Sequence, residues 1–238
     1  MRERIISWIK KQVKQAKAKG IVMGLSGGVD SCVVAALARE AVSRNRLLVL
    51  LLPCESSAAD LKDALVVAKK FKIKTKTVDL TGVYHNLLKI LPQAGKLAKN
   101  NLKPRLRMLV LYYFANKLNY LVCGTGNKSE MLAGYFTKHG DGAADILPIG
   151  GLFKKQVRAL AKELGIPGHI ISKPPTAGLW LGQTDEGEMG ITYAELDDIL
   201  ERMANKKKQF FSKSAVEKVR KMVKNSEHKR SGPKVYYI

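Results

Sequence analysis

The sequence has 238 residues, enough for one sizeable α/β domain with its own hydrophobic core. No apolar run approaches the roughly 20 residues of a membrane span, and the first residues lack a secretory signal pattern, so we expect a cytoplasmic protein without a membrane partner. The three cysteines form no close pair, which argues against a disulfide framework or a zinc knuckle. The formal net charge of +22 favours anionic partners, such as nucleotides or RNA, without choosing among them.

Helical and strand patterns alternate along the first half of the chain. Apolar residues at helical spacing between positions 5 and 13 precede a short apolar strand at 21–25 and an alanine-rich helix that starts near Cys32. The run 47–52 is apolar on successive residues, as in a strand covered on both faces. Helices at 58–71, 82–91 and 103–119 then alternate with strands at 73–78 and 120–123. This order predicts an α/β fold of the Rossmann-like type, a doubly wound, mostly parallel sheet with helices on both faces.

The second half of the chain is richer in loops. Gly, Asp, Lys and Pro dominate from Gly124 to a helix at 154–164, and a Pro- and Gly-rich passage at 174–190 precedes helices at 193–203 and 214–223. Loops of this length within a compact domain are usually functional. Because ligands bind at the carboxyl ends of parallel strands, we expect the site next to Leu25, Leu52 and Cys123.

The sequence Ser-Gly-Gly-Val-Asp-Ser at positions 26–31 lies between a strand and a helix. Such a turn aims several backbone N–H groups at one point, at the positive end of a helix dipole, and so forms a cradle for phosphate. The loop has neither the Gly-Lys-Ser/Thr of a Walker A motif nor a Gly-x-Gly-x-x-Gly pattern. It resembles the pyrophosphate loop of the ATP pyrophosphatases, and Asp30 within it suits a magnesium ligand.

Further blocks resemble the ammonia-dependent NAD synthetases of the ATP pyrophosphatase superfamily. They are Gly-Thr-Gly-Asn-Lys-Ser-Glu at 124–130, the stretches 134–145, 173–179 and 187–193, and His-Lys-Arg at 228–230. The resemblance covers nearly the whole chain from Gly20 onward. Two departures are Gly126-Asn127, where much of the family has Asp-His, and Gly178, where many members have aspartate. From the departure at Gly126-Asn127 we expect a polar contact near the adenosine to differ here.

The resemblance implies a reaction and a set of site residues. ATP would adenylate the carboxylate of deamido-NAD with loss of pyrophosphate, and ammonia would then give NAD and AMP. The matching ATP-binding residues are Gly24, Leu25, Ser26, Gly27, Gly28, Val29, Asp30, Ser31, Thr125, Lys154 and Thr176. Those matching the deamido-NAD contacts are Arg105, Lys138, Asp145, His228 and Lys229. Asp30 and Glu130 match the Mg²⁺ ligands, and the family implies a homodimer.

Two residues receive catalytic roles. Lys154 is expected to bind phosphate, and Asp141, between Gly140 and Gly142 in a stretch expected to be mobile, is hypothesised to position or deprotonate ammonium, because only NH₃ is a nucleophile. A glutaminase domain with its catalytic cysteine would need a few hundred further residues. We therefore expect one NAD synthetase domain over residues 1–238 and free ammonia as the donor.

Two other functions stay open at this stage. A tRNA-modifying ATP pyrophosphatase shares the loop and suits the positive charge, but no Cys-x-x-Cys for sulfur transfer occurs, and we do not expect a nucleic-acid partner. A non-catalytic nucleotide-binding module leaves Glu130, Asp141 and Lys154 unexplained. The helix at 103–119 is either core or subunit interface, given its apolar residues Leu106, Leu109, Val110, Tyr113 and Phe114.

Overall fold

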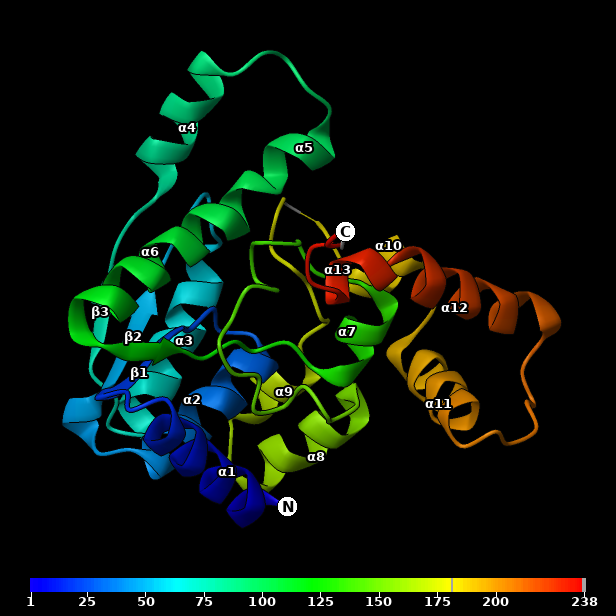
Figure 1. The fold of residues 1–238 in the computed structure, drawn as a ribbon, viewed down its shortest axis with the longest axis horizontal. Helices are drawn as coiled ribbons and strands as arrows, with labels where there is room; N and C mark the ends of the chain where they lie inside the picture. Colours follow the sequence, from blue (N-terminus) through cyan, green and yellow to red (C-terminus); the bar gives the residue numbers. More distant parts are fainter. Residues whose placement is uncertain (181, 237–238) are drawn as a thin grey trace.

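The computed structural model describes residues 1–180 and 182–236. Four parallel strands form one sheet in the order β3-β2-β1-β4: β1 (Gly20–Gly24), β2 (Leu47–Leu51), β3 (Thr75–Thr77) and β4 (Tyr120–Val122). Strands β2 and β3 lie on one side of β1, and β4 lies on its other side (Figure 1). The switch point between β1 and β4 is where a doubly wound sheet binds its ligand. The predicted doubly wound parallel sheet is confirmed, although β3 and β4 are shorter than expected.

Helices cover both faces of the sheet. In β1, Ile21 and Met23 face one apolar cluster and Val22 faces the other, which explains why the strands are apolar on successive residues. Helices α1 (Arg2–Gln15), α2 (Val29–Ala41), α3 (Ala58–Lys70), α8 (Lys154–Glu163) and α9 (Gly168–Ser172) contribute to the first cluster. The second cluster is formed with α4 (Thr81–Ile90) and α6 (Leu102–Leu118). Both faces are therefore covered over β1 and β2, whereas the edge strand β3 is largely exposed, and the carboxyl ends of the strands are left for ligands.

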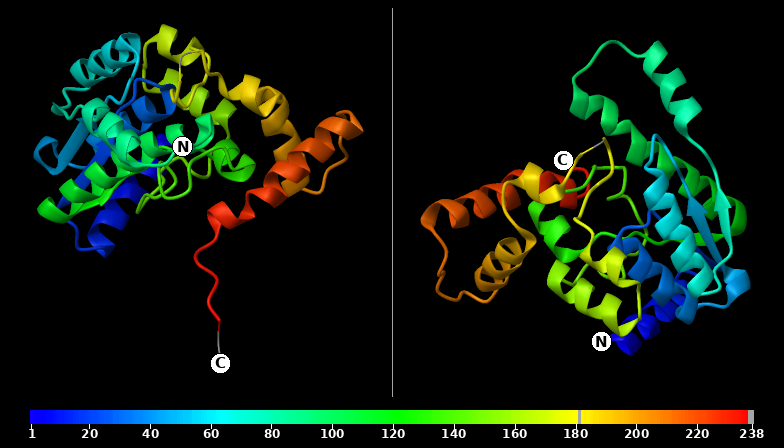
Figure 2. Two further views of the ribbon diagram at one scale, coloured as in Figure 1. Left: turned by 90° about the horizontal axis from the view of Figure 1, so that it is seen from above. Right: turned by 180° about the vertical axis from the view of Figure 1, so that it is seen from behind.

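A third apolar cluster lies beside the sheet. It joins α7 (Lys128–Ala133), α10 (Asp185–Met189), α11 (Tyr193–Ala204) and α12 (Lys213–Asn225) around the buried side chains of Tyr193, Leu196 and Ile199. Both views of Figure 2 show α11 and α12 at the side of the molecule away from β2 and β3.

The remaining short elements are η1 (Arg44–Arg46), α5 (Lys96–Asn100) and α13 (Glu227–Arg230). Among the described residues, no helix combines the length and apolar character of a membrane span.

The last helix, α13, lies next to α7 (Figure 1). Gly134 ends α7 with a left-handed φ of 71°, and a Cβ added there would lie 2.0 Å from Cβ of Ser226. Arg230 donates hydrogen bonds to the carbonyl oxygens of Met131 and Leu132 at 3.0 and 3.1 Å. A glycine is needed at position 134 both for its backbone angle and for this close approach. It lets residues 226–230 close one side of the site.

Candidate active site

A cavity of about 720 Å³ opens at the carboxyl ends of β1, β2 and β4. Its walls come from the 26–31 loop, α6, residues 134–141, residues 173–179 and α13. All the residues predicted for the site line this cavity except Gly27 and Asp145. The fold thus brings together positions that lie up to two hundred residues apart in the sequence.

The 26–31 loop is held in shape by its two serines. Ser31 Oγ receives a hydrogen bond from Ser26 N at 3.2 Å and donates to Gly28 O at 2.9 Å, and the two hydroxyl oxygens are 3.0 Å apart. Gly28 is the N-cap of α2, and no side chain caps this end of the helix. The N–H groups of the first turn therefore remain available to an anion.

Gly27 does not line the cavity because it faces α3. Its φ is +87°, and a Cβ added to it would lie 2.2 Å from the carbonyl oxygen of Asp60. No other residue type fits that combination of angle and contact. Gly27 therefore fixes the loop against α3 and leaves its neighbours to face a ligand.

Lys154 is buried between two carboxylates. Its Nζ lies 2.5 Å from Asp30 Oδ2 and 3.3 Å from Glu130 Oε1, and the side chain is only 3% exposed. Burial opposes the charge of the lysine, but both carboxylates outweigh it and raise the pKa of the ammonium. Burial raises the pKa of Glu130, an effect that Lys154 opposes and the nearby charge of Asp30 reinforces. Lys154 is thus part of the site and not a solvated charge at a helix start.

Asn127 organises this group of charges. It is the N-cap of α7, where its Oδ1 accepts from Glu130 N at 3.0 Å while Glu130 Oε2 accepts from Asn127 N at 3.2 Å. Its side-chain nitrogen donates to Asp30 Oδ1 at 3.0 Å. The departure from the family pattern at position 127 therefore lies beside the carboxylates. The Asn-x-x-Glu spacing of this capping box is visible in the sequence and was not used there.

Cationic side chains gather on another wall of the cavity. The guanidinium of Arg105 donates to the carbonyl oxygen of Lys138 at 3.3 Å, and Lys138 Nζ donates to the carbonyl oxygen of His228 at 2.6 Å. Lys229 Nζ donates to the carbonyl oxygens of Gly134 and Phe136 at 2.7 and 2.9 Å. Four of the residues predicted to contact deamido-NAD are thus linked through the backbone.

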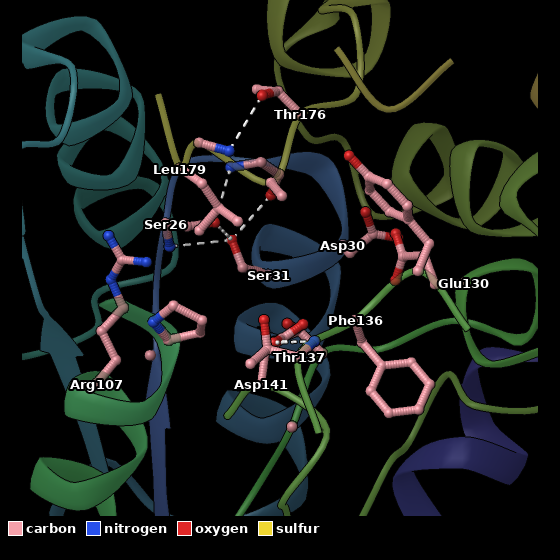
Figure 3. Close-up of a pocket in the computed structure, with 18 of the residues that line it drawn as sticks. Ser26, Asp30, Ser31, Arg107, Glu130, Phe136, Thr137, Asp141, Thr176 and Leu179 are labelled. Carbon is pink, nitrogen blue, oxygen red and sulfur yellow. Dashed lines mark hydrogen bonds between the residues drawn. The ribbon is translucent and has the colours of Figure 1, made fainter. Parts of the chain in front are cut away.

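Asp141 lies at the edge of the same cavity. Its Oδ1 accepts from the backbone N–H of Thr137 at 2.9 Å, which ties the glycine-flanked turn back onto itself. The carboxyl is open to the cavity, but the protein mass around it displaces bulk water and raises its pKa. Figure 3 shows Asp141 and Thr137 on one side of Ser31, away from Thr176. A raised pKa makes this carboxylate a stronger base than an ordinary aspartate.

Charged residues that the sequence analysis missed also line the cavity, among them Arg107 and Asp185. Arg107 donates to the carbonyl oxygen of Leu52 at 3.0 Å and to Ser56 Oγ at 3.3 Å, and Figure 3 shows it on the side of Ser26. Asp185 is 4% exposed, and its Oδ1 has no hydrogen-bond partner among the described residues. Both come from stretches whose spacing matches no motif, so only the fold reveals them.

Asp145 is placed differently from the other predicted residues. Its Oδ2 accepts from the backbone N–H of Val122 at 2.7 Å, and its Oδ1 accepts from the hydroxyl of Tyr112 at 2.9 Å. Within this chain the carboxylate connects β4 to α6 outside the cavity. The described contacts therefore give Asp145 a role in holding the sheet edge.

The sheet order, the loop at the switch point and the paired carboxylates define an α/β protein of the ATP pyrophosphatase type. The sequence model of the NAD synthase family matches residues 1–233. The chain belongs to the NAD synthase family. A curated relative, the NH(3)-dependent NAD(+) synthetase of Syntrophomonas wolfei, is 46% identical over 241 residues, covering 98% of this chain and 94% of the relative.

Solved structures agree with this assignment. The NMN synthetase from Francisella tularensis matches with a TM-score of 0.90 and 38% identity, covering 100% of this chain and 97% of that one. The NH3-dependent NAD synthetase from Campylobacter jejuni matches with a TM-score of 0.86 and 28% identity, covering 99% and 97%. The fold and the family are therefore shared along nearly the full length of both neighbours.

Proposed function

We propose that this chain is an ammonia-dependent NAD synthetase. ATP transfers AMP to the nicotinate carboxylate of deamido-NAD and releases pyrophosphate, and ammonia then displaces AMP to form the amide of NAD. The observation that carries the proposal is that the 26–31 loop, Lys154 and Asp141 line one cavity in a chain of the NAD synthase family. The family's curated relatives are named NH(3)-dependent NAD(+) synthetases.

The ATP site is supported by the free N–H groups at the start of α2 and by two threonines that line the same cavity. Ser26 and Ser31 would donate to the phosphates, with Lys154 as the nearby cation. Thr125 and Thr176 line the same cavity and would contact the remainder of the nucleotide. Pre-aimed donors of this kind stabilise charge that builds on phosphate oxygens as the carboxylate attacks.

Asp30 and Glu130 are the residues that would hold Mg²⁺. Their carboxylate oxygens converge on one cation position, the Nζ of Lys154, and hard oxygen ligands are those that Mg²⁺ prefers. Since the site offers two carboxylates, the ion would take its other ligands from phosphate oxygens and water. When bound, it would neutralise charge on the phosphates.

The cations Arg105, Lys138 and Lys229 would bind the phosphates of deamido-NAD, together with His228. They line the same cavity as Asp141, so the acceptor would lie between them and the ATP loop. Asp145 lies outside this cavity, and we propose that it meets the dinucleotide at the boundary with a second subunit. The negative substrate and the positive wall attract each other, which favours binding.

A homodimer would bring α6 against a second copy. Leu106, Val110 and Phe114 pack toward the core, whereas Leu109 and Tyr113 are 66% and 58% exposed. One face of α6 therefore packs in the core, and the other face presents exposed apolar residues that a partner could cover. Sedimentation of the purified protein tests this assembly.

Ammonia would be activated by Asp141. Its raised pKa and its position facing the cavity suit a group that takes a proton from ammonium or holds it for attack. Ammonium and glutamine are compared as nitrogen donors in an assay of NAD formation. Equal rates with glutamine would contradict the proposed donor.

The decisive experiment follows pyrophosphate and NAD formed from ATP, Mg²⁺ and ammonium, with and without deamido-NAD. We expect both products only when the dinucleotide is present. Absence of NAD would refute the proposal, and pyrophosphate released on adding tRNA instead would favour the RNA-modifying alternative.

A second acceptor, nicotinate mononucleotide, is favoured by the similarity to the Francisella NMN synthetase. It carries the same carboxylate and would be adenylated in the same way. The ratio of kcat/KM for the two acceptors distinguishes the candidates, and we expect it to favour deamido-NAD. A preference for the mononucleotide would change the substrate and leave the adenylation chemistry in place.

A further inference from the structure

Lys173 forms an ion-pair cluster at the side of α3. Its Nζ lies 2.5 Å from Asp60 Oδ1 and 2.7 Å from Asp63 Oδ2, and the Nε2 of His169 lies 3.0 Å from Asp63 Oδ1. The lysine directly follows α9, and both aspartates lie within the first two turns of α3. Burial opposes the charge of Lys173, but its hydrogen bonds to the aspartates raise the pKa of the ammonium, so the group is a cation at neutral pH.

This cluster adjoins the phosphate loop. Gly27 packs directly against the backbone of Asp60, and Asp60, Lys173 and Ser26 line the same cavity. Thr176, three residues after Lys173, faces that cavity as well (Figure 3). The side chain of Lys173 is 27% exposed, so it can move without disrupting the core.

The charges around the phosphate loop indicate that a bound polyphosphate needs a further cation there. The loop contains no lysine of its own, and Lys154 is engaged with Asp30 and Glu130. Asp60 adds a further negative charge at the edge of a cavity that must accept a polyphosphate. A triphosphate therefore meets repulsion on the α3 side unless the ammonium of Lys173 offsets it.

We propose that Lys173 is a further ATP-binding residue, one that contacts the two phosphates released as pyrophosphate. Its four-carbon stem and three N–H donors let it turn from Asp60 to a phosphate oxygen while Asp63 keeps one hydrogen bond. Binding of the polyphosphate thereby draws the segment that carries Thr176 over the nucleotide. The inference rests on the proposed use of ATP and assigns the outer phosphates to one side chain.

A purely structural role makes different predictions. If Lys173 only fastens α9 to α3, then removing either partner of the ion pair has the same consequences. Asp63 offers the matched comparison, because it holds Lys173 and His169 and does not line the cavity. Asp63→Asn weakens the same attachment, leaves the ion pair with Asp60 in place and keeps the ammonium.

The experiment compares Lys173→Met, Lys173→Arg and Asp63→Asn with the wild type. Inhibition of NAD formation by pyrophosphate and by AMP is measured for each protein, together with the thermal midpoint and direct titration with pyrophosphate. Losing a charged hydrogen bond should weaken pyrophosphate binding about tenfold or more in Lys173→Met. AMP inhibition should stay within about twofold, since AMP lacks the outer phosphates. Lys173→Arg should recover part of the loss.

The comparison with Asp63→Asn decides between the two roles. We expect it to lower the thermal midpoint, though less than Lys173→Met does because Asp60 still holds the ammonium, while its pyrophosphate constant stays near the wild-type value. Equal losses of pyrophosphate binding in both variants, or equal losses for pyrophosphate and AMP in Lys173→Met, would overturn the inference. Direct titration reports on folded protein without turnover. A wild type that binds pyrophosphate but forms no NAD would therefore refute the proposed function and not the role of Lys173.

Discussion

The side-chain amide of Asn127 donates a hydrogen bond to the carboxylate of Asp30 across the gap between α7 and α2, at 3.0 Å. The same amide group caps α7 through Glu130. One uncharged side chain thus sets the positions of both carboxylates that flank Lys154. The metal-binding and phosphate-binding roles proposed for these residues depend on that shared support.

Replacing Asn127 should separate helix capping from carboxylate positioning. Asn127→Ala removes both functions and should cost about 1 kcal/mol of unfolding free energy for the lost cap, with a strong loss of activity. Asn127→Ser keeps a capping oxygen but does not reach Asp30, so it should retain more stability and still lose activity. Urea unfolding and NAD formation check the two effects. Full activity in Asn127→Ser would show that Asp30 needs no donor.

The two glycines of the phosphate loop should respond differently to alanine. Gly27→Ala places a Cβ against Asp60 at a left-handed φ and should cost about 1–3 kcal/mol of unfolding free energy. Gly28 has a φ of −76°, and its added Cβ would meet only Ser26 Oγ, at 3.5 Å. Gly28→Ala should therefore fold normally. Thermal unfolding without nucleotide provides the measurement, and equal destabilisation by both variants would contradict this account.

Removing the charge of Lys154 should destabilise the fold as well as stop adenylation. Lys154→Met leaves Asp30 and Glu130 close together without a cation, and loss of one partner from a buried ion pair typically costs about 3–5 kcal/mol. Adding Glu130→Gln to this variant removes one uncompensated charge and should restore part of the stability but no activity. A Lys154→Met protein as stable as the wild type would argue against a buried pair.

Asp141→Asn should be more stable than the wild type at neutral pH and much less active. Because the pKa of Asp141 is raised on folding, the folded protein pays to ionise it. The stability contribution of the group is greatest below its unfolded pKa of about 3.9 and falls as pH rises through the folded pKa. The stabilisation in Asp141→Asn should therefore be present at pH 8 and vanish in acid. Melting temperatures across pH and turnover at saturating ammonium test this, and unchanged turnover would exclude a role with ammonia.

The sequence predicted the sheet because its central strands are covered on both faces and so stand out as apolar runs, as in β2, whereas β3 is a short, polar edge strand. It also located the phosphate loop, whose chemistry is local. It missed short helices such as α10, since a five-residue element is too short to show a helical period. The capping role of Asn127 could have been predicted, because its capping box spans only four residues.

The sequence could not predict which distant side chains contact one another in the fold. Arg105 and Arg107 lie two positions apart on one helix, and only the structure shows that Arg107 reaches the end of β2 while Arg105 reaches Lys138. Lys173 meets Asp60 and Asp63 across more than a hundred residues, which no local spacing encodes. Asp145 was assigned through family likeness alone, and its contacts in this chain lie at the sheet edge.

The contact between Gly134 and Ser226 has a consequence for biosynthesis of the protein. Residues 226–230 form one wall of the cavity, and they leave the ribosome after every other segment that lines it. The sheet and the phosphate loop belong to the first half of the chain and can assemble earlier. A nascent or prematurely terminated chain therefore holds a nucleotide cradle without the wall that receives the second substrate, and it acquires the complete cavity only once residues 226–230 have been made.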